Sequence, residues 1–344
     1  MRPGKSRRPD IPTDPFLERL PPVSHTRVRL LGGTFEFECG SQRLRRLVDW
    51  AYADLPPHRL SAHGPRLRVR LALAPRDRRA DRRDAPAIGT LSGAGLLCGA
   101  TASSDLAVVS PEDRSALVVL SPQLLRFPYH ARYELVEFAV FTLAGRTQGL
   151  VPLHAACVGR EGRGLLLMGD SGAGKSTLSL HCLLAGLEFV SEDSTFVAPE
   201  TLLATGVANF LHLRRDALRS VPRSTAAQIR RSPIIRRRSG VEKFEIDVRR
   251  TEFRLAARPL RVAGLVFLST RAAGSGGMLA ALRRGEALER LAASQPYGAA
   301  QPGWSAFRRG MALIPAFELR RGRHPAEAAK ALQGLLRHAG RDER

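Results

Sequence analysis

Nine consecutive residues in the middle of the chain have the composition and spacing of a phosphate-binding loop. Positions 169–177 read Gly-Asp-Ser-Gly-Ala-Gly-Lys-Ser-Thr, which matches the pattern G-x-x-x-x-G-K-[ST]. A phosphate chain needs several backbone N–H groups that point at one place, and glycines remove the side chains that would obstruct them. Lys175 supplies a positive charge for the terminal phosphates, and Ser176 offers a hydroxyl ligand to Mg²⁺. The pattern therefore predicts a nucleoside triphosphate site, with ATP and Mg²⁺ as the expected cofactors.

We expect every residue of this loop to take part in phosphate binding. Apolar residues 165–167 predict a strand before it, and the run to about Ala185 predicts a helix after it. The free N–H groups and the positive dipole end of that helix would face the phosphates. The predicted phosphate-binding residues are Gly169, Asp170, Ser171, Gly172, Ala173, Gly174, Lys175, Ser176 and Thr177.

Two acidic residues, Glu192 and Asp193, follow the next predicted strand, at 187–190. Ligands collect at the carboxyl ends of strands in an open α/β sheet. The intervening helix would return the chain, so this strand can lie beside the strand that leads into the loop. One carboxylate could then hold the metal, and the other could orient an attacking group and accept its proton.

The rest of the pattern predicts an α/β protein with a smaller α+β module at its N-terminus. Residues 1–24 are basic and proline-rich and predict a flexible tail, and residues 25–125 predict the α+β module. Residues 126–149 predict a linking helix. Strands alternate with helices in residues 150–340, which predicts the nucleotide-binding domain. Shorter patterns predict strands near 28–37, 67–73, 107–109, 116–120, 153–158, 241–247 and 263–268, a loop at 76–83, and helices after Ser41 and from Pro325.

Composition narrows the class of protein. The chain has 344 residues, of which 44% are hydrophobic, enough for a folded core. Its formal net charge is +22, but only four of its 54 basic residues are lysines, so we attribute the charge to an arginine bias and do not expect a nucleic acid partner. The four cysteines lack metal-binding spacing, and no apolar run is long enough to cross a membrane. We expect a cytoplasmic protein with reduced thiols and no membrane partner.

With these residues, the chain resembles HPr kinase/phosphorylase and the HPr-kinase-like proteins. In that family a histidine precedes the first loop glycine by fifteen residues, as His154 precedes Gly169 here. The family's loop begins Gly-Asp-Ser-Gly, and its acid pair lies 23 and 24 residues after the first glycine, where Glu192 and Asp193 stand. A looser match to about residue 295 is similar to the shorter HPr-kinase-like proteins found beside peptide-modification genes, including those for lasso peptides.

The resemblance implies a phosphoenolpyruvate-carboxykinase-like P-loop core and a kinase that acts on Ser or Thr of a peptide or small protein. It implies that Glu192 activates the acceptor hydroxyl, that Asp193 takes the second acid position, and that His154 lies near the phosphates. Ser176 and Asp193 would then be the Mg²⁺ ligands.

The chain departs from the family at two points. The family's acid pair is usually Asp-Asp, whereas Glu stands first here, and a second family signature is missing after the pair. The expectation therefore does not extend to HPr as substrate, to reverse phosphorolysis or to the family's hexamer, and a homo-oligomer stays open. The arginines of 214–238 could assist transfer, bind an acidic peptide or form a solvated loop, and Lys243 could neutralise a phosphate or pair with Glu245.

Two alternative functions remain open beside the kinase. The Glu-for-Asp difference favours a nucleotide-binding scaffold of a peptide-maturation system that transfers no phosphoryl group. The net charge favours a nucleic-acid-dependent ATPase, although no helicase or groove-reading motif is found. The sequence does not identify the phosphoryl acceptor or the role of the N-terminal module.

Overall fold

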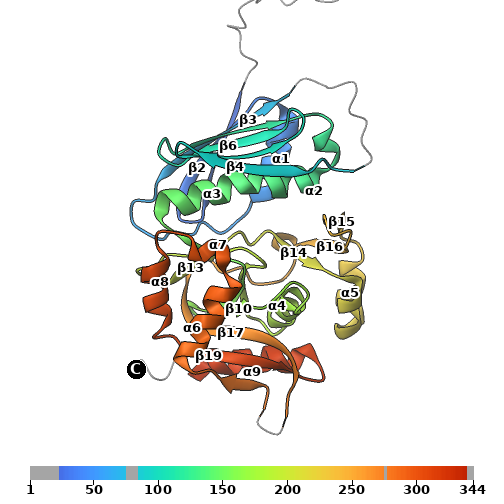
Figure 1. Cartoon of the computed structure of the whole chain (residues 1–344). Coiled ribbons are helices and arrows are strands. Elements are labelled where there is room, and N and C mark those ends of the chain that lie inside the picture. The colour runs from blue at the N-terminus through green and yellow to red at the C-terminus, as the bar shows by residue number, and fades with distance from the viewer. Residues whose placement is uncertain (1–22, 75–83, 275–276, 339–344) are drawn as a thin grey trace, which may run out of the picture.

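The computed structural model describes residues 23–74, 84–274 and 277–338, which form the arrangement in Figure 1. The predicted tail up to residue 22 and residues 76–83 of the predicted loop lie outside these ranges. The described chain is a mixed α/β structure, which confirms the α/β part of the prediction. None of its helices is long and apolar enough to span a membrane.

The residues predicted to form an N-terminal module, a name kept below for this part of the chain, contain a seven-stranded sheet. Its order in the described chain is β1-β2-β3-β7-β6-β5-β4. The strand predicted near 67–73 is present as β3, in which Leu67, Val69 and Leu71 are buried and the arginines between them are exposed. Ser41 caps α1, as predicted, by accepting a hydrogen bond from the Leu44 N–H. The elements are β1 (Ser24–Leu30), β2 (Gly33–Cys39), α1 (Gln42–Tyr52), β3 (Arg66–Leu73), β4 (Ile88–Gly93), β5 (Leu96–Thr101), β6 (Leu106–Ser110) and β7 (Ser115–Leu120).

Strands β4 and β5 have no counterpart in the sequence prediction. Most side chains of β4 are exposed, and its sequence, IGTLSG, lacks the alternation that marks a half-buried strand. Pairing with β5 therefore holds this edge strand in place, and the sequence of β4 alone does not indicate a strand.

A long helical segment follows the first sheet and packs against it. It consists of α2 (Pro128–His130), a wider π-helical stretch η2 (Ala131–Val136) and α3 (Glu137–Gln148), after a short turn η1 (Leu124–Arg126). Leu135, Val140 and Leu143 belong to the same apolar core as the first sheet. The helix expected to link two modules is thus part of the first module's core, and Figure 1 shows α3 on the side of that module that faces the second sheet.

In the part of the chain that is described, a nine-stranded sheet carries the predicted phosphate-binding loop, residues 169–177, which we call the phosphate loop. Its main path is β11-β9-β10-β17-β13-β12-β8, with β19 on β17 and β18 on β19. The elements are β8 (Val151–Leu153), β9 (Ala156–Arg160), β10 (Arg163–Met168), α4 (Lys175–Leu184), β11 (Glu188–Ser191), β12 (Thr195–Val197), β13 (Leu203–Gly206), β17 (Leu260–Ala272), β18 (Leu279–Ala281), α6 (Arg284–Ser294), α7 (Pro296–Ala299), α8 (Trp304–Met311), β19 (Ala316–Arg321) and α9 (Pro325–His338).

Both faces of strand β10 are buried. Leu165 and Leu167 belong to the core that includes residues of α4 and α9, whereas Leu166 and Met168 belong to the core that includes residues of α6 and α8. A strand covered on both faces reads as a continuous apolar run, which is the pattern that predicted it.

The prediction that the strand at 187–190, now β11, lies beside β10 is wrong, because β9 lies between these two strands. The tight turn at Glu161 and Gly162 folds β9 back onto β10, and β17 occupies the other edge of β10. Since β9 is antiparallel to both neighbours, β11 still runs in the same direction as β10. Its carboxyl end therefore reaches the loop edge of the sheet, one strand further away than expected.

A small three-stranded sheet, β14-β16-β15, lies beside α4. Its strand β16 covers most of the strand predicted at 241–247. The elements of this part are β14 (Phe210–Leu213), η3 (Arg215–Ser220), α5 (Arg223–Ile229), β15 (Ile234–Arg236), β16 (Glu242–Asp247) and η4 (Val248–Arg250).

Candidate functional site

The phosphate loop (residues 169–177) joins the end of β10 to the start of α4. Gly169, Gly172 and Gly174 have φ angles of 154°, 89° and 100°, which residues with a Cβ rarely adopt. A Cβ at Gly169 would lie 3.1 Å from the Cβ of Ala173, whereas one at Gly172 or Gly174 would meet no atom within 4 Å. The first glycine is needed for close packing, and the other two leave the backbone open toward the adjoining cavity.

The Lys175 ammonium lies at the loop, as its place in the motif predicts. Its Nζ atom donates to the Gly169 carbonyl oxygen at 2.5 Å and lies 3.1 Å from His154 Nε2. Burial lowers the pKa of Lys175, although the nearby carboxylates of Asp193 and Asp170 act in the opposite direction. The cation and the first turn of α4 are thus held next to the same open side of the loop.

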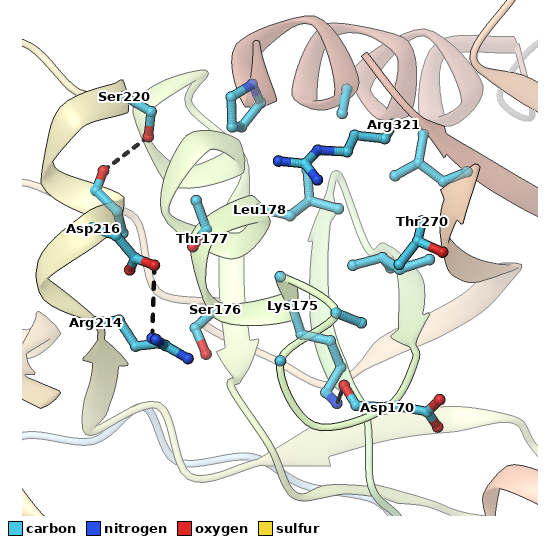
Figure 2. Close-up of a pocket in the computed structure, with 18 of the residues that line it drawn as sticks. Asp170, Lys175, Ser176, Thr177, Leu178, Arg214, Asp216, Ser220, Thr270 and Arg321 are labelled. Carbon is cyan, nitrogen blue, oxygen red and sulfur yellow. Dashed lines mark hydrogen bonds and ion pairs between the residues drawn. The ribbon is translucent and has the colours of Figure 1, made fainter. Parts of the chain in front are cut away.

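A cavity of about 600 Å³, which we call the loop cavity, adjoins the phosphate loop (Figure 2). Its size is typical of a small-molecule site. Basic side chains outnumber acidic ones in its walls, which suits a polyanion such as a triphosphate. The acidic lining residues are Asp170, Asp193 and Asp216, and the basic ones besides Lys175 are Arg214, Arg219, Arg237, Lys243, Arg320, Arg321 and Arg323.

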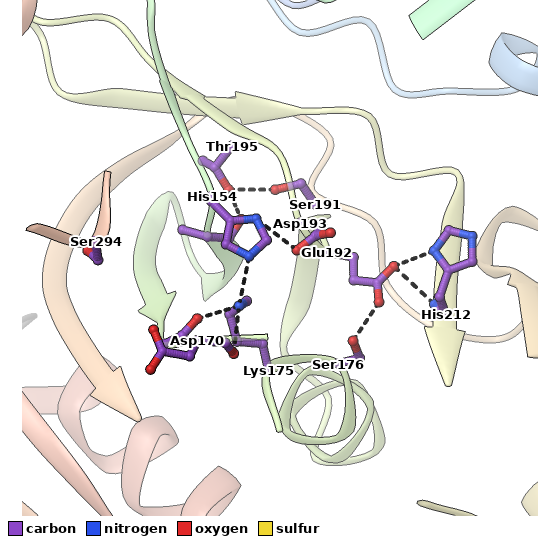
Figure 3. A network of polar contacts seen from close by, with 12 residues as sticks. His154, Asp170, Lys175, Ser176, Ser191, Glu192, Asp193, Thr195, His212 and Ser294 are labelled. Atoms are coloured by element: carbon purple, nitrogen blue, oxygen red, sulfur yellow. Dashed lines mark hydrogen bonds and ion pairs between the residues drawn. The ribbon is translucent and has the colours of Figure 1, made fainter. Parts of the chain in front are cut away.

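The two acids of the predicted pair point in different directions (Figure 3). The Glu192 carboxylate is buried behind Ser176, whose Oγ donates a hydrogen bond of 2.5 Å to Oε1. The Asp193 carboxylate instead lies 3.2 Å from His154 Nδ1 and lines the loop cavity. Glu192 therefore belongs to the serine side of the loop, and Asp193 to the histidine side.

His212 holds the other side of the Glu192 carboxylate. Oε2 of Glu192 is 2.6 Å from His212 Nδ1 and accepts the His212 backbone N–H at 3.0 Å. Burial by itself lowers the pKa of His212, but the carboxylates of Glu192 and Glu245 outweigh burial and raise it above the ordinary value of 6.5. Burial likewise favours the neutral form of Glu192, but its contacts with His212 and Ser176 lower its pKa overall. A protonated imidazole beside an ionised Glu192 is consistent with both shifts.

This contact continues into a buried chain of alternating charges. His212 Nε2 lies 3.0 Å from Oε1 of Glu245, and Glu245 is bonded in turn to Arg132. Arg132 also donates to Glu137 at 2.9 Å, and its guanidinium lies 4.5 Å from the ring centre of Trp50, on α1. The chain thus connects the acid beside Ser176 to the core of the N-terminal module.

The structure brings most of the predicted site together. Of the predicted residues, Gly169 and Glu192 do not line the loop cavity and lie directly behind Lys175 and Ser176. The rest of the predicted set lines it, namely His154, Asp170, Ser171, Gly172, Ala173, Gly174, Lys175, Ser176, Thr177 and Asp193.

The arginine stretch 214–238 separates into different roles. Arg214, Arg219 and Arg237 line the loop cavity, and Arg237 approaches Asp193 at 3.6 Å while its buried Nε makes no hydrogen bond. Arg238 instead binds Glu134 and the Ala85 and Pro86 carbonyls. Lys243 lines the loop cavity, whereas Glu245 pairs with His212 and Arg132.

The sequence did not indicate that His212 is a partner of Glu192, that Glu245 pairs with His212, or that Arg132 takes part. A signal was available for His212, because it is the one polar residue of the apolar strand FLHL. Glu245 carried no such signal, because its strand, EKFEID, is mostly charged. Arg132 also carried no such signal, since other charged residues, Glu134 and Glu137, lie close to it in the same helical segment. Arg132 takes part only because the fold brings it to Glu245, 113 positions away in the sequence.

A magnesium ion fits the oxygen atoms available beside the loop. The described residues contain no cluster of three or more His, Cys, Asp or Glu that could hold a metal alone. Mg²⁺ that binds with nucleotide phosphates needs only one or two protein oxygens. The Ser176 hydroxyl and the Glu192 carboxylate, adjacent at the start of α4, are oxygen donors of this kind.

Comparisons with known proteins add little to this geometry. No protein-family model matches the chain, and no curated protein matches it. A solved structure, the Hpr(Ser) kinase/phosphatase from Coxiella burnetii, is similar at 17% identity over 56% of this chain and 99% of that chain, with a TM-score of 0.29.

Proposed function

We propose that this chain is an ATP-dependent kinase that transfers the γ-phosphoryl group to a Ser or Thr hydroxyl of a peptide or small protein. One observation carries the proposal: the carboxylate of Asp193, 3.2 Å from the imidazole of His154, lines the same basic cavity as the phosphate loop. A triphosphate site alone needs the loop and its cations. A carboxylate in the same cavity adds a group that can accept a proton from an attacking hydroxyl.

The loop and its basic neighbours bind the nucleotide in this proposal. Backbone N–H groups of residues 169–177 and the Lys175 ammonium hold the phosphates. Ser176 and Glu192 would hold Mg²⁺, which when bound neutralises charge on the phosphate oxygens. Arg237 and Lys243 stabilise the negative charge on the phosphoryl group as it is transferred. The proposal keeps the phosphoenolpyruvate-carboxykinase-like core that the resemblance implied.

Asp193 acts as the base. It accepts the proton of the acceptor hydroxyl while the hydroxyl oxygen forms a bond to the γ-phosphorus. The bond between that phosphorus and the β–γ bridging oxygen breaks, and ADP leaves with the electron pair. His154 and Arg237 orient the Asp193 carboxylate. This assignment exchanges the roles that the resemblance implied for the two acids, because Glu192 lies against the serine that would bind the metal.

The proposal is tested by incubating the protein with Mg-ATP and a library of Ser- and Thr-containing peptides, followed by mass spectrometry. We expect a phosphorylated product that is lost in the Asp193→Asn and Lys175→Met variants. Tight Mg-ATP binding with no phosphorylated peptide would instead favour a scaffold without phosphoryl transfer. ATP hydrolysis that requires DNA or RNA would contradict the kinase directly.

A further inference from the structure

A second cavity, of about 540 Å³, adjoins the His154–Asp193 pair, which also lines the loop cavity. We call it the aromatic cavity. Of the residues that the structure describes, only His154 and Asp193 line both cavities. A molecule in the aromatic cavity therefore ends beside the carboxylate that faces the phosphate loop.

The walls of the aromatic cavity come from both halves of the protein. Phe138 and Phe141 lie on α3 of the N-terminal module, Phe196 on β12, and Tyr297 on α7. The rings of Phe141 and Phe196 meet edge to face with centroids 5.3 Å apart. Such a wall favours an apolar and especially an aromatic partner.

The aromatic cavity has too little positive charge for a second nucleotide. Among its described lining residues, Arg146 is the one Lys or Arg side chain, whereas the loop cavity has several. The amide of Gln295, a further polar lining group, is occupied, because its Oε1 accepts the His154 N–H at 2.6 Å. The remaining walls are mainly apolar, with the hydroxyl groups of Thr142, Ser194 and Ser294 among them, and the cavity opens onto the Asp193 carboxylate.

The rim of the aromatic cavity suits one side chain of a longer molecule. Tyr297 is 57% exposed, and Arg146 is also exposed. A side chain can therefore enter while the backbone that carries it stays outside. A cavity of this size holds an aromatic residue with room to spare.

We propose that the aromatic cavity binds an apolar, preferably aromatic, side chain next to the phosphorylated Ser or Thr of a peptide acceptor. The inference rests on the proposed kinase function and names its substrate class. The acceptor hydroxyl lies at Asp193, and the neighbouring side chain lies between α3 and α7. The N-terminal module then contributes one wall of the acceptor site.

The test measures peptide binding separately from phosphoryl transfer. The parent peptide has one Ser among alanines, and its variants carry Phe one or two positions before or after the Ser. Affinities are measured with the full-length protein saturated with Mg²⁺ and a non-hydrolysable ATP analogue. We expect at least one Phe peptide to bind about tenfold more tightly than the parent, because a Phe ring leaves water.

Variants locate this advantage in the aromatic cavity. Tyr297→Ala, at an exposed position, and Phe141→Ala should reduce the Phe advantage by about fivefold or more without changing affinity for the ATP analogue. Leu313→Ala removes a side chain that is 77% exposed and lies outside the cavity, and it serves as the control. Circular dichroism checks that each variant is folded.

The outcomes separate the two proposals. Phe peptides that bind no better than the parent, or an advantage that survives in the folded Tyr297→Ala and Phe141→Ala proteins, would overturn the acceptor-site inference. An advantage that depends on both residues supports it even if no peptide is phosphorylated. Absence of product under Mg-ATP would then count against the kinase proposal alone.

Discussion

The Glu192 carboxylate lies between the Ser176 hydroxyl, 2.5 Å away, and the His212 imidazole, 2.6 Å away. Its neighbour Asp193 faces His154 on the other side of the site. Two carboxylates adjacent in sequence thus occupy different environments, one buried beside the predicted metal ligand and one exposed to the cavities. This separation is the structural basis for giving them different roles.

The two acids should therefore respond differently to amidation. Asp193→Asn is expected to lower kcat by about 10²- to 10⁴-fold, with little effect on Mg-ATP affinity, because the base is lost. Glu192→Gln should raise the Mg²⁺ concentration needed for half-maximal activity. Steady-state kinetics at varied Mg²⁺ measure both effects, with Glu161→Gln, at an exposed turn, as control. An unchanged kcat in Asp193→Asn would disprove its role as base.

His212 is expected to stabilise the fold by neutralising Glu192 and Glu245. His212→Gln leaves two buried carboxylates without their shared cation, a change that typically costs about 3 to 5 kcal/mol of unfolding free energy. Denaturant unfolding measures the loss. In the His212→Gln background, Glu245→Gln should be less destabilising than in the wild type, because Glu245 has already lost its contact with His212 and keeps only its ion pair with Arg132. Additive losses would show that the contacts do not interact.

The stabilising effect of His212 should depend on pH. Its pKa is raised by the fold, so its contribution is fully present below the unfolded value of 6.5 and is lost as pH rises through the folded-state pKa. The pKa of Glu192 is lowered, so its contribution is present above the unfolded value of 4.5 and is lost as pH falls through the folded-state pKa. The stability difference between wild type and His212→Gln should be largest near about pH 6 and shrink toward alkaline pH. A difference that grows with pH would contradict the protonated state.

Lys175 is expected to be essential for nucleotide binding. Saturating Mg-ATP at about 100 times its Kd should stabilise the wild type by about 2.7 kcal/mol, seen as a rise in Tm. Lys175→Met should remove most of this rise, because the loop loses its cation. Lys330→Met, at an exposed position on α9, removes one positive charge as Lys175→Met does, but it should leave the rise in Tm with Mg-ATP unchanged. Equal rises in both variants would show that the nucleotide does not use the loop.

Arg237 is expected to act during transfer more than during nucleotide binding. Its Nη1 atom lies 3.6 Å from Oδ2 of Asp193, and its buried Nε atom has no hydrogen-bond partner. Arg237→Gln should lower kcat by about 10²- to 10³-fold, which is the usual effect of removing one transition-state donor. Arg236→Gln, at the exposed neighbouring position, is the matched control. Single-turnover kinetics with saturating ATP measure the transfer step apart from nucleotide binding. Equal transfer rates in Arg237→Gln and the wild type would show that Arg237 does not take part in transfer.

The sequence predicted the parts of the site that depend on local spacing. The loop 169–177 and its flanking strand and helix follow from a contiguous pattern, because the backbone geometry is set by its own glycines. His154 was found only through its distance from Gly169. Its position between β8 and β9, bonded through its backbone to Gln295, depends on contacts between distant segments.

Other features could not be predicted because they depend on strand order and packing. The hairpin of β9 and β10 places a strand between β10 and β11, and nothing in either strand's sequence specifies that neighbour. The contact of Arg132 with Glu245 and the aromatic cavity require η2 and α3, respectively, to pack beside the second half of the chain. The Arg132–Glu245 contact and the aromatic cavity both lie where the two halves of the chain meet.

A crystal structure of the protein with Mg²⁺ and a non-hydrolysable ATP analogue tests the central claim most directly. We predict that the triphosphate lies along residues 169–177, with the metal beside Ser176 and Glu192 and the γ-phosphate facing Asp193 and His154. A nucleotide bound elsewhere, or a γ-phosphate directed away from Asp193, would contradict the account.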